Sequence, residues 1–299
     1  MGKRKIFKIV FVILSIFLCV VFYELLGICV AYKKQPEVSN TTKKETKNGS
    51  WNECSENTER AVIIEKNPEA LLQRVRLIKN AKKEIILSTF AFQSDESGKL
   101  ILGALHDAAD RGVHIRLLVD GMESWIDMEG NPYFYGLSSH ENVEIKLYNK
   151  ANPLKPWKMM GRMHDKYLIA DGKRYILGGR NTYNYFLGDF PGHKNYDRDV
   201  LVVCDEPEKE NSVNQLLEYF ETIWEQEDSD YFHDNKKLAN RKSVKNAVLE
   251  LQNGYQKYFE ENKERICDTD YTDETFETEK IALVSNPIHT GSKEPVVWY

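Results

Sequence analysis

One short stretch of the chain carries reactive side chains at a fixed spacing. His164 and Lys166 are separated by a single residue, and Asp171 follows five residues after the lysine. We expect His164 and Lys166 to lie in a strand and to project from the same face, because alternate strand residues share a face. An imidazole beside an ammonium group suits nucleophilic attack on an anionic phosphodiester.

A second group of residues follows at once. Asp171-Gly172 predicts a tight turn, after which the chain returns to Gly178, Gly179 and Asn181. Glycines let the backbone approach a ligand closely, and the amide of Asn181 and backbone N–H groups can donate to phosphate oxygens. Each residue alone has a commoner structural role, as a core histidine or a simple turn. The prediction of a phosphate site therefore depends on the combination.

The elements that position these residues alternate between strands and helices. Helical spacing of apolar residues predicts helices over Pro68–Lys82 and Gly98–Asp110. Apolar runs bounded by turn residues predict strands over Ala61–Glu65, Glu84–Phe92, Val113–Asp120, Val143–Tyr148, Tyr167–Ala170, Tyr175–Leu177 and Val200–Cys204. Alternation with short connections predicts an α/β fold with a layered sheet flanked by helices.

The carboxyl-terminal third has a different pattern. Amphipathic spacing predicts helices over Ser212–Trp224 and Arg241–Glu260, and the acidic residues 261–280 are expected to form an exposed insertion. Ile281–Ser285 is expected to be a strand. The chain then ends on an apolar run, Pro295–Tyr299, which resembles the start of another element.

The amino terminus carries an apolar run of about membrane-spanning length. Residues 9–23 contain no charge, and basic residues at positions 3, 4, 5 and 8 precede them. We expect a retained single-pass anchor with a cytoplasmic amino terminus and an extracytoplasmic domain. A cleaved signal peptide is the alternative, although a small-residue cleavage site is poorly represented. The polar residues 33–58 are expected to tether the domain to the membrane.

Composition sets the class of the remainder. With 299 residues, 41% hydrophobic residues and a net charge of −5, the chain is typical of a globular protein, and bulk electrostatics do not favour indiscriminate nucleic-acid binding. Residues 150–180 nevertheless carry eight Lys or Arg against two Asp, a local charge of +6, which indicates an anionic ligand. The five cysteines include no CxxC pair, so no zinc site is predicted.

The order H-x-K-x4-D, followed by G-G-x-N, resembles the signature of the phospholipase D superfamily. Residues 91–95, 108–113, 117–121 and 197–200 resemble the first lobe of bacterial cardiolipin synthase-like proteins. The resemblance covers about residues 60–227. Together with the composition, it divides the chain into a membrane anchor over 1–32, the tether over 33–58, a lobe over 59–227, an acidic helical or insertion segment over 228–280, and the possible start of a second lobe over 281–299.

The resemblance also implies roles for single residues. His164 would attack phosphorus to give a phosphohistidine, with Lys166 and Asn181 holding the non-bridging oxygens and Gly178 and Gly179 close to the phosphate. Asp171 would have a structural or electrostatic role. Asp199 would orient the imidazole, with Asp197 as its nearby rival. No metal and no cofactor are implied, because Lys166 and the amide donors supply the charge stabilisation.

Enzymes of this superfamily use two such motifs, whereas none of the other six histidines of this chain fits the pattern. The second motif is expected from a homodimer or from a missing carboxyl-terminal half. The favoured function is a membrane-anchored phosphodiesterase or phosphatidyltransferase acting on phospholipids, with the aromatic and basic stretch Lys155–Met160 suited to a lipid interface. The alternatives are a nuclease with the same chemistry, which would bind nucleic acid, and an inactive truncated lobe.

Overall fold

The computed structural model describes residues 3–33, 59–158, 161–204, 206, 211–233, 235–279 and 281–285. Residues 34–58 of the predicted tether, and residues 286–299 of the predicted second lobe, lie outside these ranges. The same holds for Met159 and Met160 of the stretch expected at a lipid interface.

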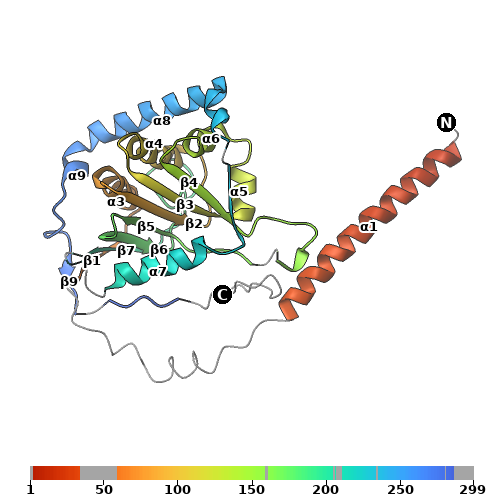
Figure 1. Ribbon diagram of the computed structural model, residues 1–299, viewed down its shortest axis with the longest axis horizontal. Helices are drawn as coiled ribbons and strands as arrows, with labels where there is room; N and C mark the ends of the chain where they lie inside the picture. The colour runs from red at the N-terminus through yellow and green to blue at the C-terminus, as the bar shows by residue number, and fades with distance from the viewer. Residues whose placement is uncertain are drawn as a thin grey trace.

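A mixed sheet forms the centre of the described domain (Figure 1). Its order is β8-β4-β3-β2-β5-β6-β7-β1-β9, in which β2, β3 and β4 are parallel and every other neighbouring pair is antiparallel. The strands are β1 Glu59–Ile64, β2 Glu84–Thr89, β3 His114–Asp120, β4 Val143–Tyr148, β5 Tyr167–Ala170, β6 Arg174–Gly178, β7 Asp199–Cys204, β8 Ser229–Tyr231 and β9 Phe276–Glu277.

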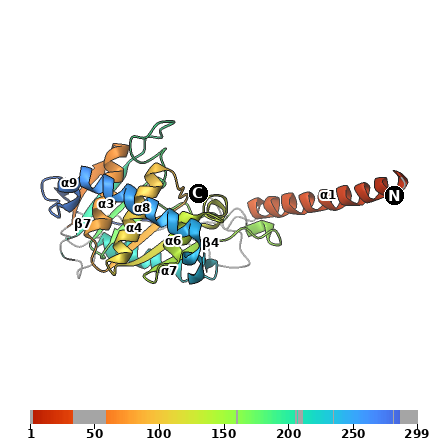
Figure 2. The same cartoon turned by 90° about the horizontal axis from the view of Figure 1, so that it is seen from above.

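Helices cover both faces of the sheet, as Figures 1 and 2 show. The helices of the described residues, including α1 outside the domain, are in chain order α1 Lys3–Lys33, α3 Asn67–Asn80, α4 Glu96–Asp110, α5 Gly121–Asp127, α6 Pro132–Ser138, α7 Ser212–Trp224, α8 Lys242–Glu261 and α9 Lys263–Cys267. The 3-10 helices are η2 Pro156–Lys158 and η3 Lys236–Asn240. The predicted α/β class, with helices flanking a layered sheet, is confirmed.

Alternation along the strands explains the two layers of core. Ile85 and Leu87 of β2 point into the cluster covered by α3, α4, α6 and α8, whereas Ile86 points into the cluster covered by α7. Because a strand has a period of two, a continuous apolar run such as Ile85–Leu87 supplies both clusters. Burial on both faces makes the centre of the sheet a rigid base for its edge loops.

Three sequence expectations about elements need correction. The strand expected over Glu84–Phe92 ends at Thr89, so that Phe90 leaves the sheet. Residues 281–285 form no strand: the backbone N–H of Leu283 donates to the side chain of Gln215 at 2.8 Å, and this segment packs against α7 instead of a strand edge. The short elements α5, α6, α9, β8 and β9 were not predicted.

The acidic residues 261–280 are not a purely exposed insertion. Ile266 and Tyr271 are buried in the main core, and the guanidinium of Arg76 lies 3.9 Å from the centre of the Tyr271 ring. Arg76 is buried in α3, and Glu274 accepts from it at 2.9 Å. A buried guanidinium needs a carboxylate partner, and the acidic segment supplies one. Since β8 also pairs with β4, the boundary predicted at residue 227 falls inside one packed body.

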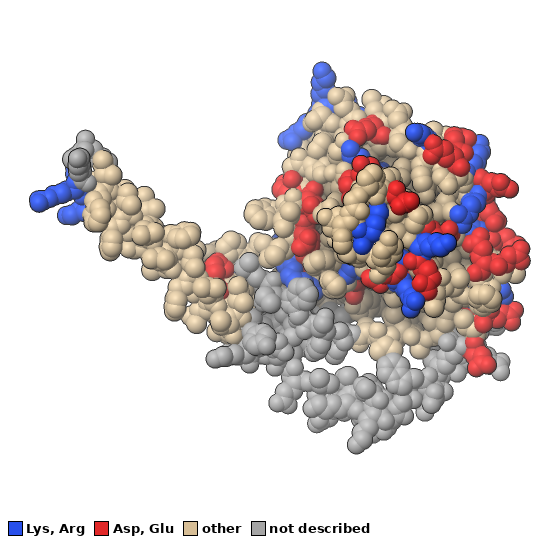
Figure 3. Space-filling model, turned by 180° about the vertical axis from the view of Figure 1, so that it is seen from behind, with Lys and Arg blue, Asp and Glu red and all other residues tan. Residues whose placement is uncertain are grey.

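Helix α1 projects away from this body in both views (Figures 1 and 2). Arg4–Val30 is the one helical stretch within the described ranges that is long and apolar enough to cross a membrane. Figure 3 shows basic side chains at its free end and an almost uncharged body. Near its other end, the Tyr23 hydroxyl donates to the Leu154 carbonyl at 2.9 Å, and Gly27 packs closely against Pro156.

Candidate active site

The reactive pair His164 and Lys166 lies where the parallel strands end. Phe90 directly follows β2, Asp120 is the last residue of β3, and His164 and Lys166 lie in the segment that leads into β5. Ligand sites of α/β sheets form at this carboxyl edge, where loops leave the sheet. His164 and Lys166 were expected inside the strand, but β5 begins only at Tyr167.

The segment before β5 is held at two points, by Asp120 and by β6, whose Gly178 N–H donates to the Lys166 carbonyl at 3.1 Å. Asp120 is buried and accepts from the guanidinium of Arg162 and, at 3.1 Å, from the backbone N–H of Met163. Its other contacts, with the backbone N–H groups of Met122 and Glu123, cap α5. One buried carboxylate therefore joins the end of β3 to the residue next to His164.

His164 is exposed at the rim of the site and contacts Phe90. The two ring centres are 4.7 Å apart in an edge-to-face arrangement. Partial burial lowers the pKa of His164 below its ordinary 6.5, and the nearby charge of Lys166 lowers it further. The imidazole is therefore mainly neutral at neutral pH, as a nucleophile must be.

Lys166 is a buried cation without an ion pair to any described residue. It is 5% exposed, its ammonium group donates to the backbone carbonyl of His164, and it lies 5.4 Å from the centre of the Phe90 ring. Burial lowers its pKa from 10.5 to about 8, against the opposing attraction of Asp165, Asp197 and Asp120. An unpaired ammonium at this depth is costly unless an anion binds it.

Most other cations of the basic stretch have structural partners. Lys158 pairs with Asp228 at 2.7 Å, Arg162 pairs with Asp120, and Arg180 pairs with Asp199. The local charge of +6 therefore overstates what a ligand would meet. The attraction for an anion comes chiefly from Lys166.

Asn181 and the two glycines are placed beside this edge, with contacts of their own. The Asn181 side-chain oxygen accepts from the backbone N–H of Ala91 at 3.2 Å, and a side-chain hydrogen bond links Asn181 to Tyr183. A Cβ atom at Gly178 would lie 2.1 Å from a carboxylate oxygen of Asp199, and one at Gly179 would lie 2.0 Å from a carboxylate oxygen of Asp197. Glycine is thus needed at both positions so that the start of β7 can approach the end of β6. The role of the two glycines in binding phosphate remains a prediction.

Asp199 and Asp197 have different surroundings. Asp199 is buried, and one of its oxygens accepts from Arg74 at 2.9 Å and lies 3.2 Å from Arg180. Asp197, by contrast, contributes to the electrostatic field at Lys166. The role of Asp199 in orienting His164 remains a prediction. Its ion pairs with Arg74 and Arg180 give it a structural role as well.

Asp171 lies at the opposite end of β5 from the reactive pair. It adopts a positive φ of 55°, with Gly172 at 62°, as a tight hairpin turn requires. Its carboxylate accepts backbone hydrogen bonds from Lys82, Lys83 and Glu84 at 2.7 to 3.1 Å. These contacts support the structural role expected for Asp171.

A cavity of about 340 Å³ opens at the site. Its walls include His164, Lys166, Gly178, Tyr219, Leu283 and Val284. The hydroxyl of Tyr219 donates to Asp165 at 2.7 Å, which sets the wall beside Lys166, and burial raises the pKa of Asp165. The segment 281–285 therefore forms one rim of the site, which the sequence did not indicate.

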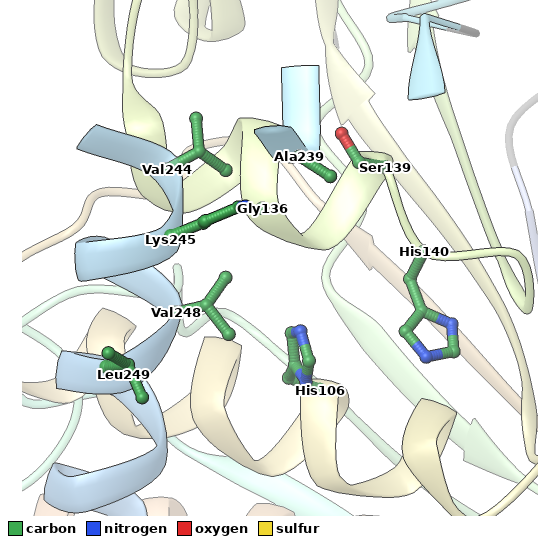
Figure 4. A pocket seen from close by; sticks show the side chains of 9 residues that line it. All are labelled: His106, Gly136, Ser139, His140, Ala239, Val244, Lys245, Val248 and Leu249. Atoms are coloured by element: carbon green, nitrogen blue, oxygen red, sulfur yellow. The ribbon is translucent and has the colours of Figure 1, made fainter. Parts of the chain in front are cut away.

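The other described histidines have partners elsewhere in the fold. His106 and His140 both contact Asp110, at 3.1 and 3.2 Å, beside a separate cavity bordered by α4, α6 and α8 (Figure 4). His114 begins β3, about 20 Å from the end that carries Asp120 at about 3.3 Å per residue. His193 contacts Asn195, and His233 lies against Tyr135. His289 lies outside the described ranges.

Asp120, Phe90 and Tyr219 were not among the predicted site residues. Asp120 had one usable signal, since a carboxylate at the end of a buried strand and before glycine is typical of a site edge. Phe90 was hidden by the overextended strand. Tyr219 comes from α7, and no local pattern places that helix beside Asp165.

Comparison with known proteins agrees with this arrangement. Residues 74–224, about half of the chain, match the family model described as cardiolipin synthase, PLD-like domain. The chain belongs to this family of phospholipase D-like proteins, which confirms the resemblance found in the sequence.

Individual relatives match half of the chain or more, but smaller fractions of their own length. A protein of Helicobacter pylori is 30% identical over 212 residues, which are 66% of this chain and 39% of the relative. Cardiolipin synthase C of Escherichia coli is 29% identical over 171 residues, 52% of this chain and 34% of that enzyme. The phosphatidylserine synthase structure of Haemophilus influenzae has a TM-score of 0.48 at 17% identity, covering 74% of this chain and 48% of that one. The chain thus spans about two fifths or less of the Helicobacter pylori protein and of the Escherichia coli enzyme.

Proposed function

We propose that this chain is a membrane-anchored phospholipase D-like lobe that cleaves or exchanges the head group of phospholipids through a phosphohistidine on His164. The observation that carries the proposal is a mainly neutral imidazole beside the buried ammonium of Lys166, which has no ion pair with a described residue. A phosphodiester supplies both the electrophilic phosphorus and the negative charge that this pair needs. Family membership and the names of the cardiolipin synthase relatives support the lipid substrate.

The reaction proceeds in two displacements. An imidazole nitrogen of His164 attacks phosphorus, so that an N–P bond forms while the P–O bond to the head-group alcohol breaks and the leaving alkoxide takes a proton from a general acid. Water then attacks phosphorus, gives up a proton and breaks the N–P bond, which releases phosphatidic acid. A second alcohol in place of water transfers the phosphatidyl group instead. Lys166 stabilises the negative oxygens in both steps.

The general acid is the missing part. A positioned acid contributes about 10²- to 10⁴-fold, and each described histidine other than His164 has partners elsewhere in the fold. We propose that a second motif histidine comes from another copy of the chain or from a further lobe.

The membrane part of the proposal rests on α1. Its 27-residue stretch Arg4–Val30 exceeds the roughly 20 residues that a bilayer core requires, and Arg4, Lys5 and Lys8 lie at its amino-terminal end. We infer that the amino terminus is cytoplasmic and the catalytic domain extracytoplasmic. Protease added to spheroplasts should then remove the domain and leave a short membrane fragment. If the protease can reach the outer membrane face and the domain is still fully protected, the domain lies on the cytoplasmic side and the inferred orientation is wrong.

Trapping of the intermediate tests the chemistry. The full chain in detergent, as a dimer or together with a lobe that carries the second motif, is incubated with radiolabelled phospholipid and quenched in base. Labelled peptide is mapped by mass spectrometry. We expect acid-labile phosphate on His164, and none in His164→Ala. His193→Gln is the matched control, because His193 lies outside the H-x-K-x4-D motif and its ring contacts Asn195. Label on another residue contradicts the proposal, and label only from a nucleic-acid substrate favours the nuclease alternative.

A further inference from the structure

One apolar surface beside α1 is unusually exposed for a folded domain. Trp125 and Ile126 of α5 are 69% and 66% exposed, and Leu154 in the loop before η2 is 77% exposed. A cavity of about 680 Å³ lies among them, with walls that include Met122, Trp125, Ile126, Leu147, Pro153 and Phe232. Exposed apolar patches around a cavity mark sites for lipid or protein partners. This cavity is separate from the one at His164.

The position of α1 decides between these partners. The Leu154 carbonyl accepts a hydrogen bond from Tyr23, and Pro156 packs against Gly27. At 1.5 Å per residue, a bilayer core of about 30 Å takes about 20 residues, so that a span starting after Lys8 ends near residue 28. Tyr23 and Gly27 then lie in the outer part of the span. Leu154 therefore lies in the outer leaflet, about 7 to 8 Å inside the edge of the hydrocarbon core at 1.5 Å per residue.

The neighbouring side chains fit the same environment. Tryptophan and tyrosine favour the membrane interface, where an apolar ring and a polar edge are both accommodated. Lys155 is exposed next to Leu154 and can approach anionic head groups, while Pro153 connects Leu154 to the cavity beside Trp125. The patch thus extends the apolar surface of α1 onto the domain, and Figure 1 shows α5 on the side of the domain nearest α1.

We propose that the surface formed by Trp125, Ile126 and Leu154 rests in the outer leaflet of the bilayer that holds α1, with its cavity open to lipid acyl chains. This inference rests on the membrane anchorage put forward above. It deepens that function, because Asp120 caps α5 and also holds the segment of His164. Contact of α5 with lipid therefore fixes the distance and orientation of the catalytic edge relative to the membrane.

Fluorescence quenching by lipid tests the surface directly. The full chain is reconstituted in vesicles of phosphatidylcholine and phosphatidylglycerol whose acyl chains are brominated near the head group. The contribution of Trp125 is obtained by subtracting the emission of Trp125→Phe, because the chain has five tryptophans. As a matched control, Leu249→Trp is added to Trp125→Phe, since Leu249 is 57% exposed on α8. We expect the quenched fraction of the Trp125 emission to be at least twice that at position 249.

Two further readings keep the outcome unambiguous. Flotation of the vesicles after an alkaline wash reports anchorage by α1 independently of α5. A chain that does not float overturns the anchorage and the surface together, whereas one that floats with equal quenching at both positions overturns the surface alone. Protection of Trp125 from lipid, with Trp125→Phe converting a dimer to a monomer, would assign the surface to a second copy of the chain and also overturn it.

Discussion

Two buried groups of charges lie at the ends of β5, β6 and β7, and they are built in opposite ways. Asp199 is enclosed by Arg74 and Arg180, so that its buried charge is compensated within the protein. Lys166 is almost as deeply buried but has no ion pair with a described residue, and its pKa is lowered to about 8. The comparison indicates that the first group stabilises the fold, while the second is left for an anionic ligand.

The strongest test of this difference is removal of the nucleophile. His164→Ala should lower turnover of a phospholipid by about 10⁴-fold or more, equivalent to about 5.5 kcal/mol. Its ring is exposed at the rim, so the melting temperature should stay within a few degrees of wild type. Turnover of purified protein and calorimetry measure both effects. Retained turnover in His164→Ala would remove the basis for treating this end of the sheet as catalytic.

Asp199→Ala should show the reverse pattern. It leaves two buried guanidinium groups without their shared carboxylate, which should destabilise the fold by about 3–5 kcal/mol. Urea unfolding of the detergent-solubilised chain measures this loss, and Glu65→Ala is a control because the Glu65–Arg198 pair is exposed. A stable Asp199→Ala protein with impaired turnover would instead support the orienting role implied by the family resemblance.

Lys166→Met should separate stability from activity. Removal of the unpaired ammonium should leave unfolding free energy unchanged or raised, since no described ion pair is lost. Turnover should fall by about 10²- to 10³-fold, because the negative oxygens lose their nearest cation. Parallel unfolding and rate measurements give the two values. A large loss of stability would show that Lys166 belongs with the compensated group.

The smallest expected effects are the changes of activity and stability with pH that follow from the pKa values of His164 and Lys166. Activity should rise as His164 loses its proton at a pKa below 6.5, and fall as Lys166 loses its proton near pH 8. Stability should change in the other direction, because a lysine with a lowered folded pKa binds fewer protons than in the unfolded chain. Its contribution therefore increases with pH between about 8 and 10.5.

Rate and unfolding profiles from pH 5 to about 10.5 measure both trends. In Lys166→Met the alkaline limb of activity and this stability increment should disappear together. If the alkaline limb persists in Lys166→Met, another group is responsible for it.

The sequence predicted the parts of the site that depend on local order. The turn at Asp171-Gly172, the strands on each side of it and the closeness of His164 to Lys166 all follow from short-range patterns. Asp120 and Tyr219 could not be placed in the same way, because they reach the site from β3 and α7 through packing of distant segments. The acidic residues 261–280 misled for a related reason: local composition does not show that Arg76 requires Glu274.

Asp171 has one more consequence, which concerns distance along the chain. Its carboxylate is bonded to the backbone that opens β2, and four strand residues lie between it and Lys166. The spacing in H-x-K-x4-D therefore sets a distance of about 16 Å between Asp171 and Lys166, at about 3.3 Å per residue. A slip of β5 by two residues would keep every side chain on the same face of the sheet. It would nevertheless displace His164 by about 7 Å relative to Phe90. Such a slip would break the backbone hydrogen bonds to the Asp171 carboxylate. The turn at Asp171 therefore determines the position of His164 at the other end of β5.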